Sequence, residues 1–218
     1  MANATVVCHT AYVALVDNDH KIPLWVAYEL TAAHLAKSCL PRDDAFHIDP
    51  ALPKDSAKPS DYENSGYDKG HQDPAEENTW DAAVQYDSFS MANMAPQLPG
   101  LNREGWAHLE ETVRSWTASR GPLTVYTGPV LGDDKTIDDH IAVPTAFWKV
   151  IVDKDNHVIA FEMPNAAVEQ GPLDPYQVPL SKIEHDAAIS FPFTSEDCCA
   201  MWPVDLPTYQ KQHEADCK

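Results

Sequence analysis

The stretch Asn102-Arg-Glu-Gly-Trp106-Ala-His-Leu109-Glu-Glu-Thr-Val113-Arg-Ser-Trp116-Thr-Ala-Ser119 decides the fold class of this chain. Its large apolar residues, at positions 106, 109, 113 and 116, have the spacing of one face of an α-helix. Asn102 is a good N-cap residue, and Gly121-Pro122 is a typical helix end. The pattern predicts one long helix over Arg103–Ser119.

Strand-like segments lie on both sides of this helix. They are Tyr12–Val16, Leu24–Leu30, Leu123–Tyr126, Phe147–Val152 and Val158–Met163, with one short helix over Thr31–Lys37. Because strands and helices do not alternate regularly, we expect an α+β fold with a central, mostly antiparallel sheet flanked by helices. Residues 41–81 are rich in Pro, Asp, Ser and Gly and are predicted as a long loop, which is usually functional or disordered.

Length and composition indicate an ordinary folded protein. The 218 residues, 44% of them hydrophobic, suit one large domain or two small ones. Since no repeat or low-complexity linker interrupts them, a single domain over residues 1–218 is expected. No apolar run approaches the roughly 18 residues of a membrane span, so no membrane partner is expected.

The charge is strongly acidic, with 34 Asp and Glu against 15 Lys and Arg and a net charge of −19. Charge alone argues against a nucleic-acid partner, because such partners usually meet a basic surface. Residues 93–122, however, carry three arginines and three glutamates and are neutral. Two interpretations stay open: a small cationic cleft on an acidic body, or a merely solvated acidic surface.

Five cysteines leave at least one without a partner in the chain, and no CxxC pair favours a zinc site. The expected pairings are Cys198 or Cys199 with Cys217, and Cys8 with Cys39. Disulfides would place the protein in an oxidising compartment, so a secreted or periplasmic location is expected. The polar start does not resemble a signal peptide, which suggests a mature form.

Two segments carry candidate catalytic chemistry. His71 follows a glycine in the long loop, and its ordinary pKa near 6.5 suits a general base. Asn102, Glu110 and Arg114 lie along the helix, and the side-chain oxygens of Asn102 and Glu110 suit Mg²⁺. Asn102 and Glu110 are eight residues apart, roughly 12 Å of helix, so both serve one ion only if Glu110 acts through a water.

Each of these residues also has a structural interpretation. A histidine in a loop is usually structural, and Asn102 alone is explained as a helix cap. Glu110 and Arg114 alone are an exposed i, i+4 pair.

The combination resembles the DNA/RNA non-specific endonuclease family of the ββα-metal type. Asp68-Lys-Gly-His71 is similar to the Asp-Arg-Gly-His signature of that family. Asn93-Met-Ala-Pro-Gln97, followed by Asn102 and Trp106-x-x-Leu-Glu110-x-x-x-Arg114, is similar to its second motif. Further similar segments follow in the expected order over about residues 10 to 165: Trp25–Leu30, Asp49–Leu52, Tyr126–Pro129 and Val143–Val150.

The resemblance implies roles for these residues in hydrolysis of DNA and RNA to 5′-phosphate products. His71 would activate the attacking water, Asn102 would be the direct protein ligand of one Mg²⁺, and Glu110 would hold waters of that ion. Arg114 would contact the phosphate or steady the region of Glu110. Arg42 would stabilise the transition state. Asp68, Asn93 and Gln97 would support the site, with Asn93 and Gln97 orienting it through hydrogen bonds.

One residue departs from the signature. Lys69 replaces the usual arginine, which keeps the charge but loses the two-pronged contact to phosphate. Mn²⁺ is expected to substitute for Mg²⁺, and a homodimer is left open. The alternatives are a catalytically impaired binding protein that kept the nuclease fold, or an acidic metal-binding or interaction protein.

Overall fold

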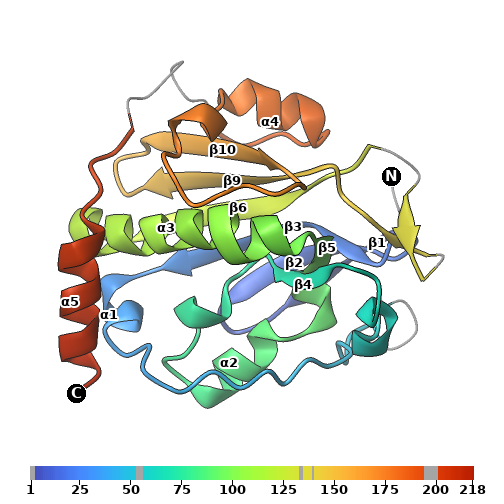
Figure 1. The fold of residues 1–218 in the computed structure, drawn as a ribbon, viewed down its shortest axis with the longest axis horizontal. Coiled ribbons are helices and arrows are strands. Elements are labelled where there is room, and N and C mark those ends of the chain that lie inside the picture. Colours follow the sequence, from blue (N-terminus) through green and yellow to red (C-terminus); the bar gives the residue numbers. More distant parts are fainter. Residues whose placement is uncertain (1–2, 53–55, 133–134, 139, 194–200) are drawn as a thin grey trace.

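The computed structural model describes residues 3–52, 56–132, 135–138, 140–193 and 201–218. A six-stranded sheet in the order β1-β2-β3-β6-β9-β10 forms the centre, and all its neighbouring strands are antiparallel (Figure 1). The strands are β1 Ala4–Cys8, β2 Tyr12–Asp17, β3 Ile22–Leu30, β6 Leu123–Val130, β9 Ala146–Asp153 and β10 Val158–Pro164. This sheet with flanking helices confirms the predicted α+β class.

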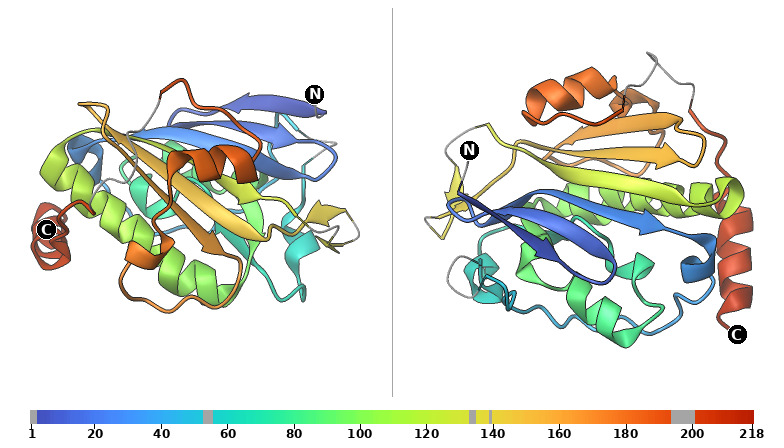
Figure 2. Two further views of the ribbon diagram at one scale, coloured as in Figure 1. Left: turned by 90° about the horizontal axis from the view of Figure 1, so that it is seen from above. Right: turned by 180° about the vertical axis from the view of Figure 1, so that it is seen from behind.

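Strand β9 lies at the junction of two apolar cores. All eight of its residues are buried, and successive side chains of a strand point to opposite faces. Phe147 and Ile151 belong to the core under helix α3, whereas Trp148 and Val150 belong to the core under α4 (Leu180–Asp186). The side chain of Lys149 lies on the same face of the strand as Phe147 and Ile151. Apart from Asp153 at the end of the strand, it is the only charged residue on that face. Helices therefore cover both faces (Figure 2).

The long α-helix begins at Trp106, where its apolar pattern begins, rather than at the predicted Arg103. Residues Leu101–Gly105 form a π-helical turn, which continues directly into α3 (Trp106–Arg120). Asn102 is therefore inside this turn, and the expectation that it caps the helix was wrong. Wider π-turns occur often at functional sites because they change the direction of a side chain within a helix.

The long loop over residues 41–81 contains structure that its composition hides. It includes the short strand β4 (Asp68–His71), which pairs with β5 (Met94–Gln97) outside the main sheet. Short helical turns also occur over Pro59–Tyr62 and Ala75–Glu77. Helix α2 (Ala82–Ser88) and the turn Met91–Asn93 connect β4 to β5.

A small hairpin, a turn and a short helix lie outside the central sheet. Strands β7 (Thr136–Ile137) and β8 (Ile141–Ala142) form the hairpin, and a further turn covers Asp174–Tyr176. Helix α1 (Ala32–Leu35) begins as expected at Thr31, whose side chain accepts a hydrogen bond from the His34 N–H. Among the described helices, none has the length and apolar character needed to cross a membrane.

The disulfide pairing differs from both expected pairs. Cys39 bonds to Cys217, at the end of α5 (Leu206–Asp216), across 178 positions of sequence. Cys8 is free and exposed, so the expected bond between Cys8 and Cys39 was wrong. Cys198 and Cys199 lie outside the described residues, but Cys217 is not available to either. The bond holds α5 beside α1 and the end of α3 (Figure 1).

Candidate active site

A cavity of about 700 Å³ opens between the paired strands β4 and β5 and the first turns of α3. Seven of the residues predicted for the site line it: Arg42, Asp68, Lys69, His71, Asn102, Glu110 and Arg114. Residues from three distant parts of the sequence therefore meet around one space. Asn93 and Gln97 are fully buried and do not belong to its lining.

The tight pairing of β4 with β5 brings His71 to the cavity. Gly70 pairs with Ala95, and a Cβ atom added to this glycine would lie 2.6 Å from the Cβ of Gln97. Only glycine therefore allows the two strands to approach so closely. Gln97 serves this packing, and its amide has no hydrogen-bond partner among the described residues, in contrast to the expected orienting role.

Asn93 supports the segment that follows His71. Its side-chain oxygen accepts a hydrogen bond from the Asp73 N–H at 2.9 Å, and its amide donates to the Asp73 and Ser88 carbonyls at 2.9 and 2.8 Å. The Gln72 N–H also donates to the Asn93 carbonyl at 3.0 Å. These bonds fix the backbone immediately after His71.

His71 is held in an apolar setting that keeps it neutral. Its side chain is 8% exposed, and its ring lies edge-on to Phe89 with centroids 4.9 Å apart. Burial, followed by the positive charge of Arg42, lowers the pKa of His71 to about 4. The Nε2 atom is buried and has no hydrogen-bond partner among the described residues. A neutral imidazole can accept a proton from a water molecule that reaches it.

Asp68 orients Asn102. The Asn102 amide nitrogen donates to Asp68 Oδ2 at 2.8 Å, while Arg103 donates to both oxygens of the same carboxylate at 2.8 and 2.6 Å. Burial acts to raise the pKa of Asp68, but the hydrogen bonds from Arg103 and Asn102 lower it below its ordinary value. Because the amide nitrogen is engaged, the Asn102 oxygen is left as the group that can bind a cation.

Glu110 lies on α3, eight residues after Asn102, and is 9% exposed. Burial raises its pKa to about 8, against the positive charge of Lys149, which acts to lower it. A divalent cation would favour the charged form of this carboxyl. Together the carboxamide and carboxylate oxygens form a donor set of the hard kind that Mg²⁺ and Mn²⁺ prefer, so these residues fit such an ion.

Arg114 extends the site one turn beyond Glu110. Its Nη1 lies 3.7 Å from Oε1 of Glu77, a buried carboxyl that sequence analysis missed. Burial raises the pKa of Glu77 to about 7, with Arg114 and Lys149 acting in the opposite direction. Nothing in the local sequence marks Glu77, because its partner is 37 positions away.

Lys149 is the second residue that sequence analysis missed. Its side chain is fully buried, and its nitrogen donates to Tyr28 Oη at 3.3 Å and to the Gln72 carbonyl at 3.4 Å. The same nitrogen lies 5.1 Å from the ring centroid of Trp106. A lysine within an apolar strand is the signal that could have found it, since buried charges are rare unless they are paired.

Arg42 and Lys69 supply positive charge at the mouth of the cavity. Arg42 donates to Asp44 at 2.8 Å and to Glu76 at 2.7 Å, and its guanidinium lies 5.2 Å from the Phe89 ring centroid. Lys69 lies 4.8 Å from the ring centroid of Phe46. Both cations are therefore placed where a phosphate can reach them.

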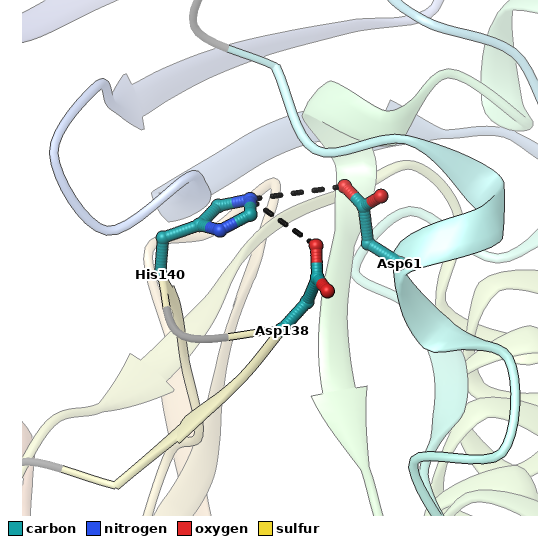
Figure 3. Close-up of side chains that lie close together, drawn as sticks. All are labelled: Asp61, Asp138 and His140. Atoms are coloured by element: carbon teal, nitrogen blue, oxygen red, sulfur yellow. Dashed lines mark ion pairs between the residues drawn. The ribbon is translucent and has the colours of Figure 1, made fainter.

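Two other groups have the residue types of metal ligands. Asp61, Asp138 and His140 offer ligand atoms within 4.8 Å of one another, and His140 Nε2 lies 3.9 and 3.8 Å from the two carboxylates (Figure 3). In the second group, Asp153, Asp155 and His157, the Asp153 carboxylate already accepts hydrogen bonds within its own turn. Neither group lines the main cavity.

Comparison with known proteins gives consistent matches. A family model for DNA/RNA non-specific endonucleases matches residues 2–196. The chain is 32% identical over 199 residues to the mitochondrial endonuclease G of Homo sapiens, with 83% of this chain and 67% of that protein covered. It is 32% identical over 201 residues to nuclease C1 of Cunninghamella echinulata var. echinulata, with 83% and 80% covered.

The fold agrees with these matches. The crystal structure of an EndoG/EndoGI complex contains a chain that superposes with a TM-score of 0.73 at 32% identity, covering 85% of this chain and 84% of that one. The resemblance seen in the sequence is thereby confirmed. Because the family match spans nearly all of its length, the chain belongs to the DNA/RNA non-specific endonuclease family and is a metal-dependent endonuclease that hydrolyses phosphodiester bonds.

Proposed function

We propose that this protein hydrolyses both DNA and RNA with little regard for sequence, uses one Mg²⁺, and leaves 5′-phosphate ends. The observation that carries the proposal is the shared cavity of His71 and Asn102. His71 is neutral and has a free nitrogen, while Asp68 turns the oxygen of Asn102 toward cation binding. The proposed base and the proposed cation ligand thus line the same cavity.

The side chains divide the reaction between them. His71 removes a proton from the attacking water, and Arg42 and Arg114 hold the phosphate oxygens as negative charge develops. Asn102 would hold the metal directly, and Glu110 would support its water shell. The bound cation supplies further charge stabilisation at the phosphate. Since these groups contact the backbone rather than the bases, sequence preference is small.

The setting of the enzyme follows from the disulfide. Bonds such as Cys39–Cys217 are typical of oxidising compartments, which supports a secreted or periplasmic location. Association into a homodimer stays a prediction. It is tested by the molecular mass of the purified protein in solution.

The decisive experiment is digestion of plasmid DNA and of RNA by purified protein with Mg²⁺, Mn²⁺, Ca²⁺ or EDTA. Both substrates are expected to be cut with Mg²⁺ or Mn²⁺ and to stay intact in EDTA. End labelling of the products is expected to require removal of a 5′-phosphate. The His71→Ala variant is expected to lose hydrolysis while keeping its fold by circular dichroism.

Two results would overturn the assignment. Unchanged cleavage by His71→Ala would show that His71 is not the general base. Full cleavage in EDTA would show that the reaction needs no metal ion. Binding of nucleic acid without any cleavage by the unaltered protein would favour the impaired binding protein instead.

A further inference from the structure

A second, smaller cavity of about 220 Å³ adjoins the main one, and Tyr67 lines both. Tyr67 precedes β4, so its half-buried ring stands immediately before Asp68 and Lys69 at the edge of the site. Leu98 and Pro144 contribute apolar lining, while Lys135 and Thr145 are exposed at the rim. Tyr67 therefore lies at the boundary of both cavities, and the smaller one has apolar as well as polar residues in its lining.

The pocket is held in shape by hydrogen bonds. Asn165 accepts from the Leu98 N–H at 2.8 Å and donates to the carbonyls of Pro96 and Pro144 at 3.0 and 2.9 Å. One side chain thus joins three segments of the wall. The Lys135 carbonyl accepts from the Val143 N–H at 2.9 Å, which fixes the backbone that carries the lysine.

Charge separates this pocket from the main cavity. Five carboxylates line the main cavity, those of Asp44, Asp68, Glu76, Glu110 and Glu111. No carboxylate lines the smaller pocket, and Lys135 is its one charged residue among those described. Within the described lining, Lys135 therefore gives the smaller pocket a positive charge that attracts a polyanion.

Lys135 and Tyr67 are spaced to contact one nucleotide together. The lysine nitrogen lies 5.2 Å from the centroid of the Tyr67 ring. An aromatic ring offers a stacking surface for any base, and an adjacent lysine offers a contact for phosphate. This pairing of contacts tolerates all sequences, in keeping with a non-specific enzyme.

We propose that the pocket formed by Tyr67, Leu98, Lys135, Pro144 and Thr145 is a binding subsite for the nucleotide that flanks the scissile phosphate. The base lies against Tyr67 and Pro144, and its outer phosphate contacts Lys135. The inference rests on the proposed function, because it needs a polynucleotide in the main cavity. The occupant of the subsite is a nucleotide of the same strand that is cleaved.

The test compares Lys135→Ala and Lys135→Glu with Lys154→Glu, an exposed lysine in the β9–β10 turn, as a control of equal charge change. Steady-state rates are measured on a single-stranded 20-mer at several NaCl concentrations. The same variants are assayed on bis(p-nitrophenyl) phosphate, a small diester without a flanking nucleotide.

Lys135→Ala is expected to raise the KM for the 20-mer about threefold to tenfold, and Lys135→Glu more. The dependence of log KM on log salt is expected to weaken by about 0.7, the value for one phosphate contact to a single strand. Rates on the small diester should stay unchanged, as should all rates of Lys154→Glu. Thr145→Lys, which adds a cation at the rim, is expected to lower the KM for the 20-mer.

Two outcomes would overturn the subsite. Lys135 variants that behave like Lys154→Glu on the 20-mer would show that no contact exists there. An equal loss on both substrates would assign Lys135 to the reaction centre instead. Failure of the unaltered protein to cleave either substrate would count against the proposed function itself, which keeps the two conclusions apart.

Discussion

The side-chain nitrogen of Lys149 lies 3.4 Å from the carbonyl oxygen of Gln72, the residue that follows His71. Through this contact the central sheet holds the strand that carries the general base. The same nitrogen faces the ring of Trp106 at the start of α3, the helix that carries Glu110. One buried cation therefore joins the two halves of the site.

Replacement of Lys149 by methionine is expected to reduce kcat about 10- to 100-fold, the usual effect of losing a group that orients catalytic residues. The Gln72 carbonyl would lose its donor, and Glu77 and Glu110 would lose a nearby positive charge. The measurement is kcat and KM on plasmid DNA, together with the thermal unfolding midpoint. Lys149→Arg, which keeps the charge, should recover part of kcat. An unchanged kcat in Lys149→Met would show that the contact has no influence on the reaction.

Release of Arg42 from its carboxylate partners is expected to favour substrate binding. The ion pairs of Arg42 with Asp44 and Glu76 are exposed, and pairs of that kind contribute only about 0.5–1 kcal/mol. Glu76→Gln should therefore lower KM roughly two- to fivefold at low salt. In an Arg42→Ala background the same substitution should have no such effect. If it lowers KM equally in both backgrounds, the gain does not pass through Arg42.

The acidic limb of the pH–rate profile is expected to lie unusually low. His71 acts as a base only while neutral, and its pKa of about 4 keeps it neutral well below the ordinary 6.5. As pH falls through about 4, proton uptake removes the base and kcat/KM should fall about tenfold per pH unit. Arg42→Gln removes a positive charge that lowers the pKa of His71. The acidic limb of the pH–rate profile of this variant should therefore lie at higher pH than that of the unaltered enzyme. A midpoint near 6.5 in the unaltered enzyme would contradict the burial argument.

Glu110 adds a second signature to that profile. Its pKa of about 8 without metal means that protons and the cation compete for the carboxylate. Any limb that moves to lower pH when the Mg²⁺ concentration is raised is assigned to Glu110, whereas the limb of His71 should stay fixed. Profiles at two Mg²⁺ concentrations separate the two groups.

Salt is expected to accelerate the enzyme before it inhibits it. Five carboxylates and four cations line the main cavity, and the whole chain carries −19. Repulsion of a polyanion is screened at an ionic strength on the order of 0.1 M, where the Debye length is about 10 Å. The initial rate on plasmid DNA should therefore reach its maximum above zero added NaCl. A rate that only falls from zero salt onward would refute this expectation.

The motifs allowed more of the site to be predicted than of the fold around it. His71, Asn102, Glu110 and Arg114 were expected around one phosphate, and the structure places all four on one cavity. Their individual roles stay predictions. The apolar spacing of α3 was also visible, because a helical period repeats over several turns. The π-helical turn before it was not, since none of its residues marks a change from the regular helical hydrogen bonding.

Long-range partners account for most of what the sequence could not indicate. Strand β4 has only four residues and acquires its conformation by pairing with β5, 23 or more positions later. Lys149 lies among apolar residues of a strand, and its partners come from β3 and from the segment after β4. Cys39 was expected to pair with Cys8, and spacing alone does not identify its actual partner, Cys217.

The bond between Cys39 and Cys217 closes most of the chain into a covalent ring. A protease that cuts one peptide bond anywhere between these two positions opens the ring without separating the pieces. Nicked enzyme would run as a single species on a gel until a reductant is added. A cut in an exposed loop would therefore leave the catalytic strand and α3 tethered to each other.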